Sequence, residues 1–171
     1  KQKASAVTHH RQRMTHKKQK SAMNISNIAL VQTTLTQVQM EAEAFTGLFY
    51  GRLFDQHPEL RPLFPTDLGT QGARWLAALQ FAITGLNQPQ TIVAAIKQLG
   101  QRHAGYGVRD DHYHLMGEAL LWSLAQTLGD AFTPEVETAW TEAYALLAGL
   151  MKEAACQVCD NNLGVFRTAF G

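Results

Sequence analysis

The sequence is poor in the features that mark disulfide-stabilised, membrane-spanning and secreted proteins. Two cysteines among 171 residues cannot hold a fold of this size together, which excludes a disulfide scaffold. No apolar run reaches the length of about 18 residues that a membrane-spanning helix needs. The N-terminus also lacks the apolar block of a secretory signal. We therefore expect a cytoplasmic protein without a membrane span.

Acidic side chains are absent from the first 23 residues, which contain seven lysines and arginines. The remaining 148 residues hold eight basic side chains against all 14 acidic ones. A body with net negative charge argues against nucleic acid as the main partner. Because segment 1–23 also has little to bury, we expect it to be a disordered basic leader or a tag.

Strand-like alternation and hairpin dipeptides are likewise missing, whereas apolar residues recur at helical spacing from residue 24 onward. The sequence therefore predicts an all-α domain over residues 24–155, followed by a tail at 156–171. The first predicted helix begins at an N-cap, Ser26, and ends at about Met40. The second ends just before Pro58, and the third ends near Asn87. Three further helices are predicted over 91–104, 111–128 and 134–155. Gly129 is a stop signal, and Thr133 with Pro134 is a start signal.

His103 is the most informative single residue, because it continues the apolar face that Ile92, Ile96 and Leu99 define on its helix. A lone histidine at such a position is usually a hydrogen-bonded core residue. A neutral imidazole that projects from a helix into an apolar slot can also hold haem iron from one side. Segments 64–67 and 103–108 would frame such a slot, and the side chains that could line it are Tyr50, Phe64, Gln71, Trp75, Val108 and Tyr113.

Four stretches carry a recognisable pattern in the right order: LFYGRLFDQHPELRPLF (48–64), LGQRHAGYGV (99–108), HYHLMGEALLWSL (112–124) and LGDAFTPEVETAWTEAYALLA (128–148). With their spacing they resemble the globin family, and specifically the globin domain of flavohaemoglobins and neuroglobin-like single-domain bacterial globins. The resemblance implies a globin fold, with helices packed three-over-three around a non-covalently bound haem b. It also places His103 at the position of the proximal iron ligand.

The same resemblance assigns the opposite, distal side of the pocket. Tyr50 corresponds to the family's distal tyrosine and Gln71 to its distal glutamine, and both can donate hydrogen bonds to a ligand on the iron. Because glutamine is a poorer iron ligand than histidine, we expect five-coordinate ferrous iron. Phe64 corresponds to the phenylalanine that stacks on the haem. The alternatives are a tyrosine whose hydroxyl reaches the surface, an exposed glutamine and a core phenylalanine.

Two departures from the flavohaemoglobin pattern concern the proximal side and electron supply. Tyr113 follows His103 by ten residues, as in that family, where it helps to orient the imidazole. The acid expected eleven residues after Tyr144 is replaced by Ala155, and Glu153 falls on another face of the helix. His103 should therefore donate less electron density to iron. No flavin or nicotinamide domain follows, so redox turnover would need a separate reductase.

Trp75 stands where the family usually has leucine or valine above the iron. A tryptophan there would crowd the ligand, or its indole nitrogen would be a third hydrogen-bond donor. A change of register by one residue would instead turn Leu76 inward and leave Gly72 on the distal side. The sequence does not decide between these arrangements.

The resemblance favours a haem protein that reversibly binds or transports oxygen, nitric oxide or carbon monoxide. The alternatives are a nitric oxide dioxygenase or nitrite reductase that works with a separate reductase, a haem-based gas sensor, and a globin fold without haem. No catalytic residue is assigned.

The remaining candidates have simpler interpretations. Cys156 and Cys159 could form a regulatory or intermolecular disulfide. The histidines beside charged residues or proline are expected to be solvated: His57, His112 and His114. Trp122 and Trp140 are expected to pack in the core.

Overall fold

The structure, a computed structural model, describes residues 23–64 and 67–169, with side chains as far as Cys156. The helices are α2 (Ile25–Met40), α3 (Ala42–Gln56), α4 (Leu68–Thr84), α5 (Pro89–Gly105), α6 (Asp110–Leu128) and α7 (Pro134–Ala169), with short 3₁₀ turns η1 (Pro58–Leu63), η2 (Gly85–Asn87) and η3 (Gly129–Ala131). These residues contain no strand, which confirms the all-α prediction. The search for a helix able to cross a membrane finds none in the described part of the chain. The predicted leader lies outside it, except for Met23.

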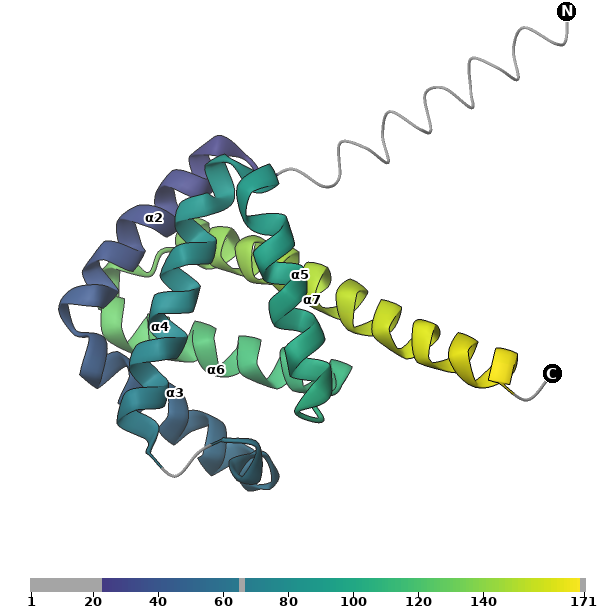
Figure 1. The fold of residues 1–171 in the computed structure, drawn as a ribbon. Helices are drawn as coiled ribbons and strands as arrows, with labels where there is room; N and C mark the ends of the chain where they lie inside the picture. The colour runs from purple at the N-terminus through teal and green to yellow at the C-terminus, as the bar shows by residue number, and fades with distance from the viewer. Residues whose placement is uncertain (1–22, 65–66, 170–171) are drawn as a thin grey trace, which may run out of the picture.

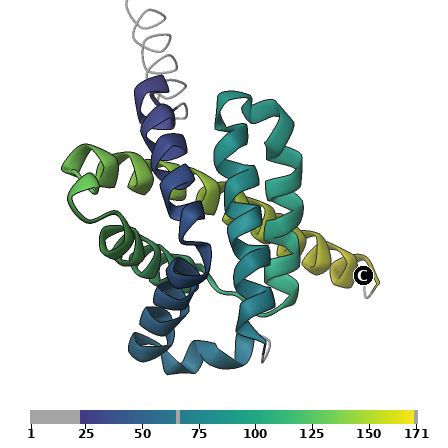
Figure 2. The ribbon, with the colours of Figure 1, turned by 90° about the vertical axis from the view of Figure 1, so that its left-hand side faces the viewer.

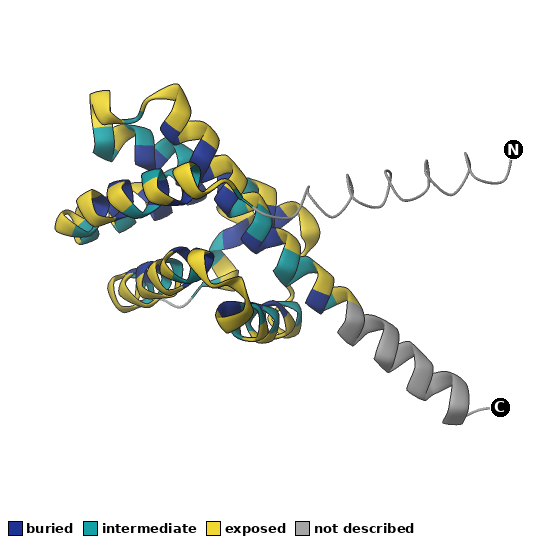
Figure 3. Cartoon of the chain, turned by 90° about the horizontal axis from the view of Figure 1, so that it is seen from above, coloured by how far each residue is buried: buried dark blue, intermediate teal, exposed yellow. Residues whose placement is uncertain are grey.

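The helices pack in two layers, α2, α4 and α5 over α3, α6 and α7. Helix α3 packs against α4 and α6, whereas α5 packs against α7, which also contacts α2 and α6. Helices α4 and α5 form an antiparallel hairpin joined by η2, and α7 crosses behind them (Figures 1 and 2). Viewed from above, buried residues face inward between the helices and exposed residues cover the outside (Figure 3). This is the three-over-three arrangement expected from the sequence.

Helix ends follow the local side-chain chemistry. The N-cap of α2 is Asn24, whose side-chain oxygen accepts a hydrogen bond from the backbone N–H of Ser26 at 3.1 Å. The prediction of Ser26 as the cap was therefore wrong by two residues, since Asn and Ser are about equally good at this position. Gly129 ends α6 with a φ of +53°, a conformation that glycine adopts without strain.

The last helix is longer than predicted. Helix α7 starts at Pro134 as expected, with the Thr133 hydroxyl accepting from the backbone N–H of Val136 at 3.4 Å, but it continues to Ala169 rather than ending near Ala155. Residues 156–169 contain no proline and a single glycine, so nothing in their sequence forces an end. The helix extends past the ends of α5 and α6 (Figure 1).

Helix α5 approaches α7 through a glycine. A Cβ placed on Gly100 would lie within 2.3 Å of the backbone oxygen of Met151, so only glycine allows this crossing. Gly100 precedes His103 by one helical turn. The crossing therefore fixes the position of His103 relative to α7.

The core contains a buried polar pair that links α2 to α7. Trp140 is fully buried, as predicted, and its indole N–H donates to the Thr34 hydroxyl at 2.9 Å. The Thr34 hydroxyl itself donates to the carbonyl of Leu30 at 2.8 Å. The hydroxyl thus satisfies a donor that would otherwise be buried without a partner.

Replacement of Thr34 by valine is expected to lower the free energy of unfolding by about 1–3 kcal/mol. Valine has nearly the volume of threonine but no hydroxyl, so the buried Trp140 N–H loses its hydrogen-bond acceptor. Urea unfolding followed by circular dichroism measures the change. Thr36→Val is the matched control, since the exposed Thr36 hydroxyl bonds only to the carbonyl of Gln32, at 3.1 Å. Equal effects of the two substitutions would contradict the assigned role of Thr34.

Candidate functional site

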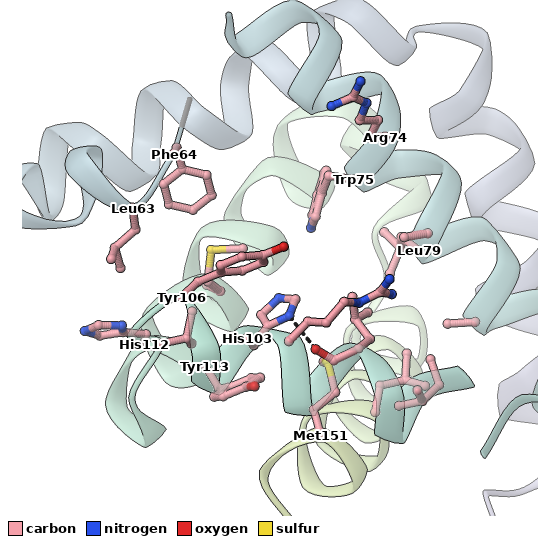
Figure 4. A pocket seen from close by; sticks show the side chains of 18 of the residues that line it. Leu63, Phe64, Arg74, Trp75, Leu79, His103, Tyr106, His112, Tyr113 and Met151 are labelled. Carbon is pink, nitrogen blue, oxygen red and sulfur yellow. Dashed lines mark hydrogen bonds between the residues drawn. The ribbon is translucent and has the colours of Figure 1, made fainter. Parts of the chain in front are cut away.

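A cavity of about 390 Å³ opens between α4 and α5 and is closed by η1, α6 and α7 (Figure 4). Its lining is mostly apolar, as is usual for cofactor pockets. Six of the seven residues expected from the sequence line it: Phe64, Gln71, Trp75, His103, Val108 and Tyr113. The seventh, Tyr50, lies behind the wall. The structure therefore gathers residues from five separate segments around one space.

His103 projects from the last turn of α5 into this cavity, and one of its ring nitrogens is already engaged. Its Nδ1 lies 2.8 Å from the carbonyl oxygen of Leu99 (Figure 4). Since a carbonyl can only accept, Nδ1 donates to it, and in the neutral imidazole this leaves the lone pair on Nε2. The backbone N–H of Val108 donates to the carbonyl of His103 at 3.1 Å and fixes the end of the helix. The ring is thus oriented with its coordinating nitrogen available.

Tyr113 lies beside His103 on the proximal side. The two rings are 6.2 Å apart and inclined by 26°, and within the described part of the chain the buried Tyr113 hydroxyl has no hydrogen-bond partner. Burial, with a smaller contribution from Asp110, raises the pKa of Tyr113. The Tyr144 hydroxyl donates to the backbone oxygen of Tyr113 at 2.6 Å. Tyr113 is therefore held from its backbone, and its own hydroxyl makes no hydrogen bond.

Among the residues C-terminal to Tyr144 whose side chains the structure describes, none supplies a carboxylate to His103. Glu153 extends to Lys97, at 3.7 Å on the other side of α5, and Ala155 cannot ionise. The hydrogen-bond partner of the imidazole is instead the neutral carbonyl of Leu99. The ring consequently receives less negative charge than it would from an acid.

On the opposite wall, α4 presents Gln71 and Trp75 to the cavity. Gly72 faces Thr46 of α3 instead, and Leu76 is buried away from the cavity lining. Of the two registers that the sequence allowed, the structure has the one with Gln71 and Trp75 inward. The Trp75 side chain projects from α4 into the cavity toward His103 (Figure 4).

Tyr50 lies behind this wall rather than on the cavity surface. Its ring contacts those of Phe64 and Trp75, with centroids at 5.5 and 6.3 Å, and its hydroxyl is buried beside the Gln71 side chain. Burial raises the pKa of Tyr50 to about 12, and the neighbouring Gln71 side chain opposes this rise. The hydroxyl therefore remains a proton donor at neutral pH.

The cavity mouth carries residues that the sequence reasoning missed. Arg74 of α4 and Arg102 of α5 line it, and Tyr106 is 70% exposed there. Helical spacing could have found the two arginines, because each directly precedes an inward-facing residue, Trp75 or His103. Basic side chains at this edge favour an anionic group at the entrance.

His112 also borders the cavity, and the prediction that it is solvated was wrong. The residue is only 5% exposed, and its Nδ1 accepts a hydrogen bond from the backbone N–H of Arg109 at 3.2 Å. It occupies the third position of α6, where the side chain folds back to cap the helix. His114 is exposed as predicted, and His57 is half-buried beside Glu59.

Trp122 and Cys156 complete the set of sequence candidates. Trp122 is half-buried under the guanidinium of Arg52, which lies 5.1 Å from its ring. Cys156 is exposed on α7, and the side chain of Cys159 falls outside the described residues. Neither Trp122 nor Cys156 lines the cavity.

Comparison with known proteins decides the family. The globin family model matches residues 47–151, which include both walls of the cavity. The chain belongs to the globin family. Globins bind haem b non-covalently, so haem b is the cofactor of this family.

Individual relatives place this globin more closely. It is 34% identical over 124 residues to a flavohemoprotein of Bacillus subtilis and 35% identical over 126 residues to one of Deinococcus radiodurans. These matches cover 71% and 72% of this chain but only 31% of each flavohemoprotein.

Solved structures show the same fold. An engineered carbene transferase from Rhodothermus marinus, described as a proposed nitric oxide dioxygenase, superimposes with a TM-score of 0.73 at 29% identity, covering 83% of this chain and 99% of its own. A bacterial globin from Campylobacter jejuni gives 0.72 at 21% identity, covering 80% and 99%. The resemblance inferred from the sequence is confirmed.

The residues of the cavity fit haem. A free imidazole nitrogen faces an apolar space, basic side chains stand at its mouth, and the buried Tyr113 hydroxyl has no hydrogen-bond partner among the described residues. An unpartnered buried hydroxyl costs free energy, which a bound group that accepts its hydrogen bond would recover.

Proposed function

We propose that this globin binds oxygen, or another diatomic ligand, reversibly at haem iron held by His103. The observation that carries the proposal is the free Nε2 of His103, which faces Gln71 and Trp75 across the apolar cavity. Haem iron supplies the coordination site at which a diatomic ligand binds, and the protein supplies everything else.

His103 would hold the iron through Nε2 as a neutral ligand, with its ring orientation fixed by the Leu99 carbonyl. Phe64 and Val108 would contribute flat apolar contacts to the macrocycle. Arg74 and Arg102 at the mouth would pair with its carboxylates. Each of these roles uses a side chain that already points into or borders the cavity.

Gln71 and Tyr50 form the donor pair of the distal side. The Gln71 side chain lines the cavity, whereas the Tyr50 hydroxyl lies behind the wall beside Gln71 and would reach the ligand from there. Both are uncharged donors at neutral pH. The Gln71 amide does not ionise, and the pKa of Tyr50 is raised to about 12. Donors in a site with little water stabilise a ligand that carries partial negative charge. Tight retention of oxygen follows from this arrangement.

Replacement of Tyr50 by phenylalanine is expected to raise the oxygen dissociation rate about tenfold or more, since one hydrogen bond to a charged acceptor is worth about 1.5–3 kcal/mol. Stopped-flow displacement of oxygen by carbon monoxide measures the rate. Because Tyr50 stays protonated, the wild-type rate should be constant from neutral pH to about pH 10. Tyr106→Phe at the exposed rim is the control. An unchanged rate in Tyr50→Phe would remove Tyr50 from the mechanism.

Conversion of nitric oxide and oxygen to nitrate is a second candidate function. The Rhodothermus marinus neighbour, 29% identical, is described as a proposed nitric oxide dioxygenase. The reaction consumes one electron for each nitrate formed, so here it is proposed to depend on a separate reductase. Stoichiometric nitrate production over many turnovers, with a reductase added, would establish this activity. A single turnover that stops at the ferric protein would leave reversible ligand binding as the function.

A further inference from the structure

We propose that Trp75 is the specificity-determining residue of the distal pocket: it limits the ligand to two or three small atoms and donates a hydrogen bond to it. The inference rests on the proposed function, since it concerns the ligand at the same site. It differs from that function because the Tyr50 and Gln71 donors could act without any limit on ligand size.

The indole of Trp75 is immobilised by an aromatic stack on α3. Its ring lies 4.0 Å from that of Phe49, with the planes only 14° apart, and 5.9 Å from that of Phe45. Both phenylalanines are fully buried. Rotation of the indole away from the cavity would therefore break a packed core contact, and interiors packed at this density resist such a movement.

The backbone on which Trp75 sits is also held close to α3. A Cβ on Gly72 would lie 3.0 Å from the Cβ of Thr46, so α4 comes as near to α3 as a glycine permits. Gly72 lies three residues before Trp75, and Thr46 lies three residues before Phe49. The contact of Gly72 with Thr46 and that of Trp75 with Phe49 are one helical turn apart. Together they hold the indole of Trp75 against Phe49, with the outer edge of the indole in the cavity.

The outer edge of Trp75 is polar. The indole N–H makes no hydrogen bond within the described residues, and it points into the cavity toward His103 (Figure 4). An indole donates and never accepts. The position that faces the free nitrogen of His103 is consequently narrow and suited to a ligand whose outer atom accepts a hydrogen bond.

These features define the ligand class. Oxygen, nitric oxide and cyanide are short and accept a hydrogen bond at the outer atom. Imidazole and long-chain isocyanides require the volume that the indole fills. A pocket wall discriminates strongly by size, since one methylene is worth roughly 10–200-fold in specificity.

The test uses the haem-loaded full chain and two isocyanides that differ only in length. Methyl and n-butyl isocyanide are titrated into the ferrous wild type and into Trp75→Leu, with the Soret shift as readout. We expect Trp75→Leu to raise the ratio of n-butyl to methyl affinity by about tenfold or more. An unchanged ratio would overturn the size limit.

Trp75→Phe tests the hydrogen bond with an aromatic ring still packed on Phe49, although it removes the five-membered ring of the indole together with its N–H. The oxygen dissociation rate of this variant should rise about tenfold or more, which is the effect of losing one hydrogen bond to an acceptor that carries negative charge. An unchanged rate would overturn the donor role. This variant also retains the packing if leucine at position 75 prevents folding.

Trp122→Leu is the matched control, because Trp122 is half-buried under Arg52 on α6 and does not line the cavity. Both readouts should match the wild type. Failure of the wild type to take up haem would overturn the proposed function and this inference together. Normal haem uptake through His103, with unchanged ligand ratios and rates in both Trp75 variants, would overturn the role of Trp75 alone.

Discussion

Haem affinity is expected to fall by more than about 100-fold when His103 is replaced by glycine, because loss of the ligand should exceed the 10–100-fold cost of losing an outer-shell partner. No other described side chain on the α5 wall of the cavity offers a comparable nitrogen: the remaining lining residues of that helix are Ile96, Leu99 and Arg102. Titration of the unloaded protein with haemin, followed at the Soret band, measures the affinity.

Added imidazole distinguishes loss of a ligand from loss of structure. It should restore much of the Soret absorption of His103→Gly, since the glycine leaves room for a free imidazole at the same place. His114→Gly is the control, because this histidine is 76% exposed on α6 and away from the cavity. Wild-type haem affinity in His103→Gly would refute the assignment of the proximal ligand.

Gly100→Ala is expected to destabilise the protein by about 2–3 kcal/mol, the effect of forcing extra atoms into a packed contact. The new methyl group would meet the Met151 backbone oxygen at 2.3 Å, and a backbone atom cannot move aside as a side-chain end can. Because His103 follows one turn later, haem affinity should fall as well. Urea unfolding and haemin titration provide the two measurements.

The matched control for Gly100 is on the partner helix. Gly149 of α7 is exposed, and a Cβ there would have no neighbour within 4 Å. Gly149→Ala should therefore stabilise the protein by roughly 0.5–1 kcal/mol, because alanine favours the helical backbone. If both alanine variants were stabilised, the close crossing of α5 and α7 would be contradicted.

Most of the fold could be predicted from the sequence because helical periodicity reports directly which face is buried. The stripe through Ile92, Ile96 and Leu99 places His103 on an inner face, and in the structure His103 borders the cavity. Periodicity does not report where a helix ends when no residue prevents its continuation. Helix α7 therefore extends beyond its predicted end.

Helical periodicity was enough to place His103 at the candidate site, whereas Gln71 and Phe64 were expected there because of the resemblance to the globin family. The position of Tyr50 behind the wall depends on how closely α3 approaches α4, which is set by the contact of Gly72 with Thr46. That contact joins residues 26 positions apart, and a pattern along one helix carries no information about it.

The environment of His112 was missed for a different reason. A histidine between an aspartate and a tyrosine has the composition of a surface segment, but capping geometry at the start of α6 turns its ring inward. The interaction partner is a backbone N–H, which the side-chain sequence does not reveal. For the same reason, the Leu99 carbonyl could not be foreseen as the partner of His103.

The cavity lies between two pairs of packed helices, since α4 packs against α3 and α5 packs against α7. A group that fills the space would touch both pairs at once and act as part of the core. Binding to the native state alone stabilises it by mass action, and here the gain would be concentrated where the two pairs meet. Backbone amides of α5 should therefore show the largest increase in hydrogen-exchange protection on haem loading, while those of α3, already packed against α6, should change least.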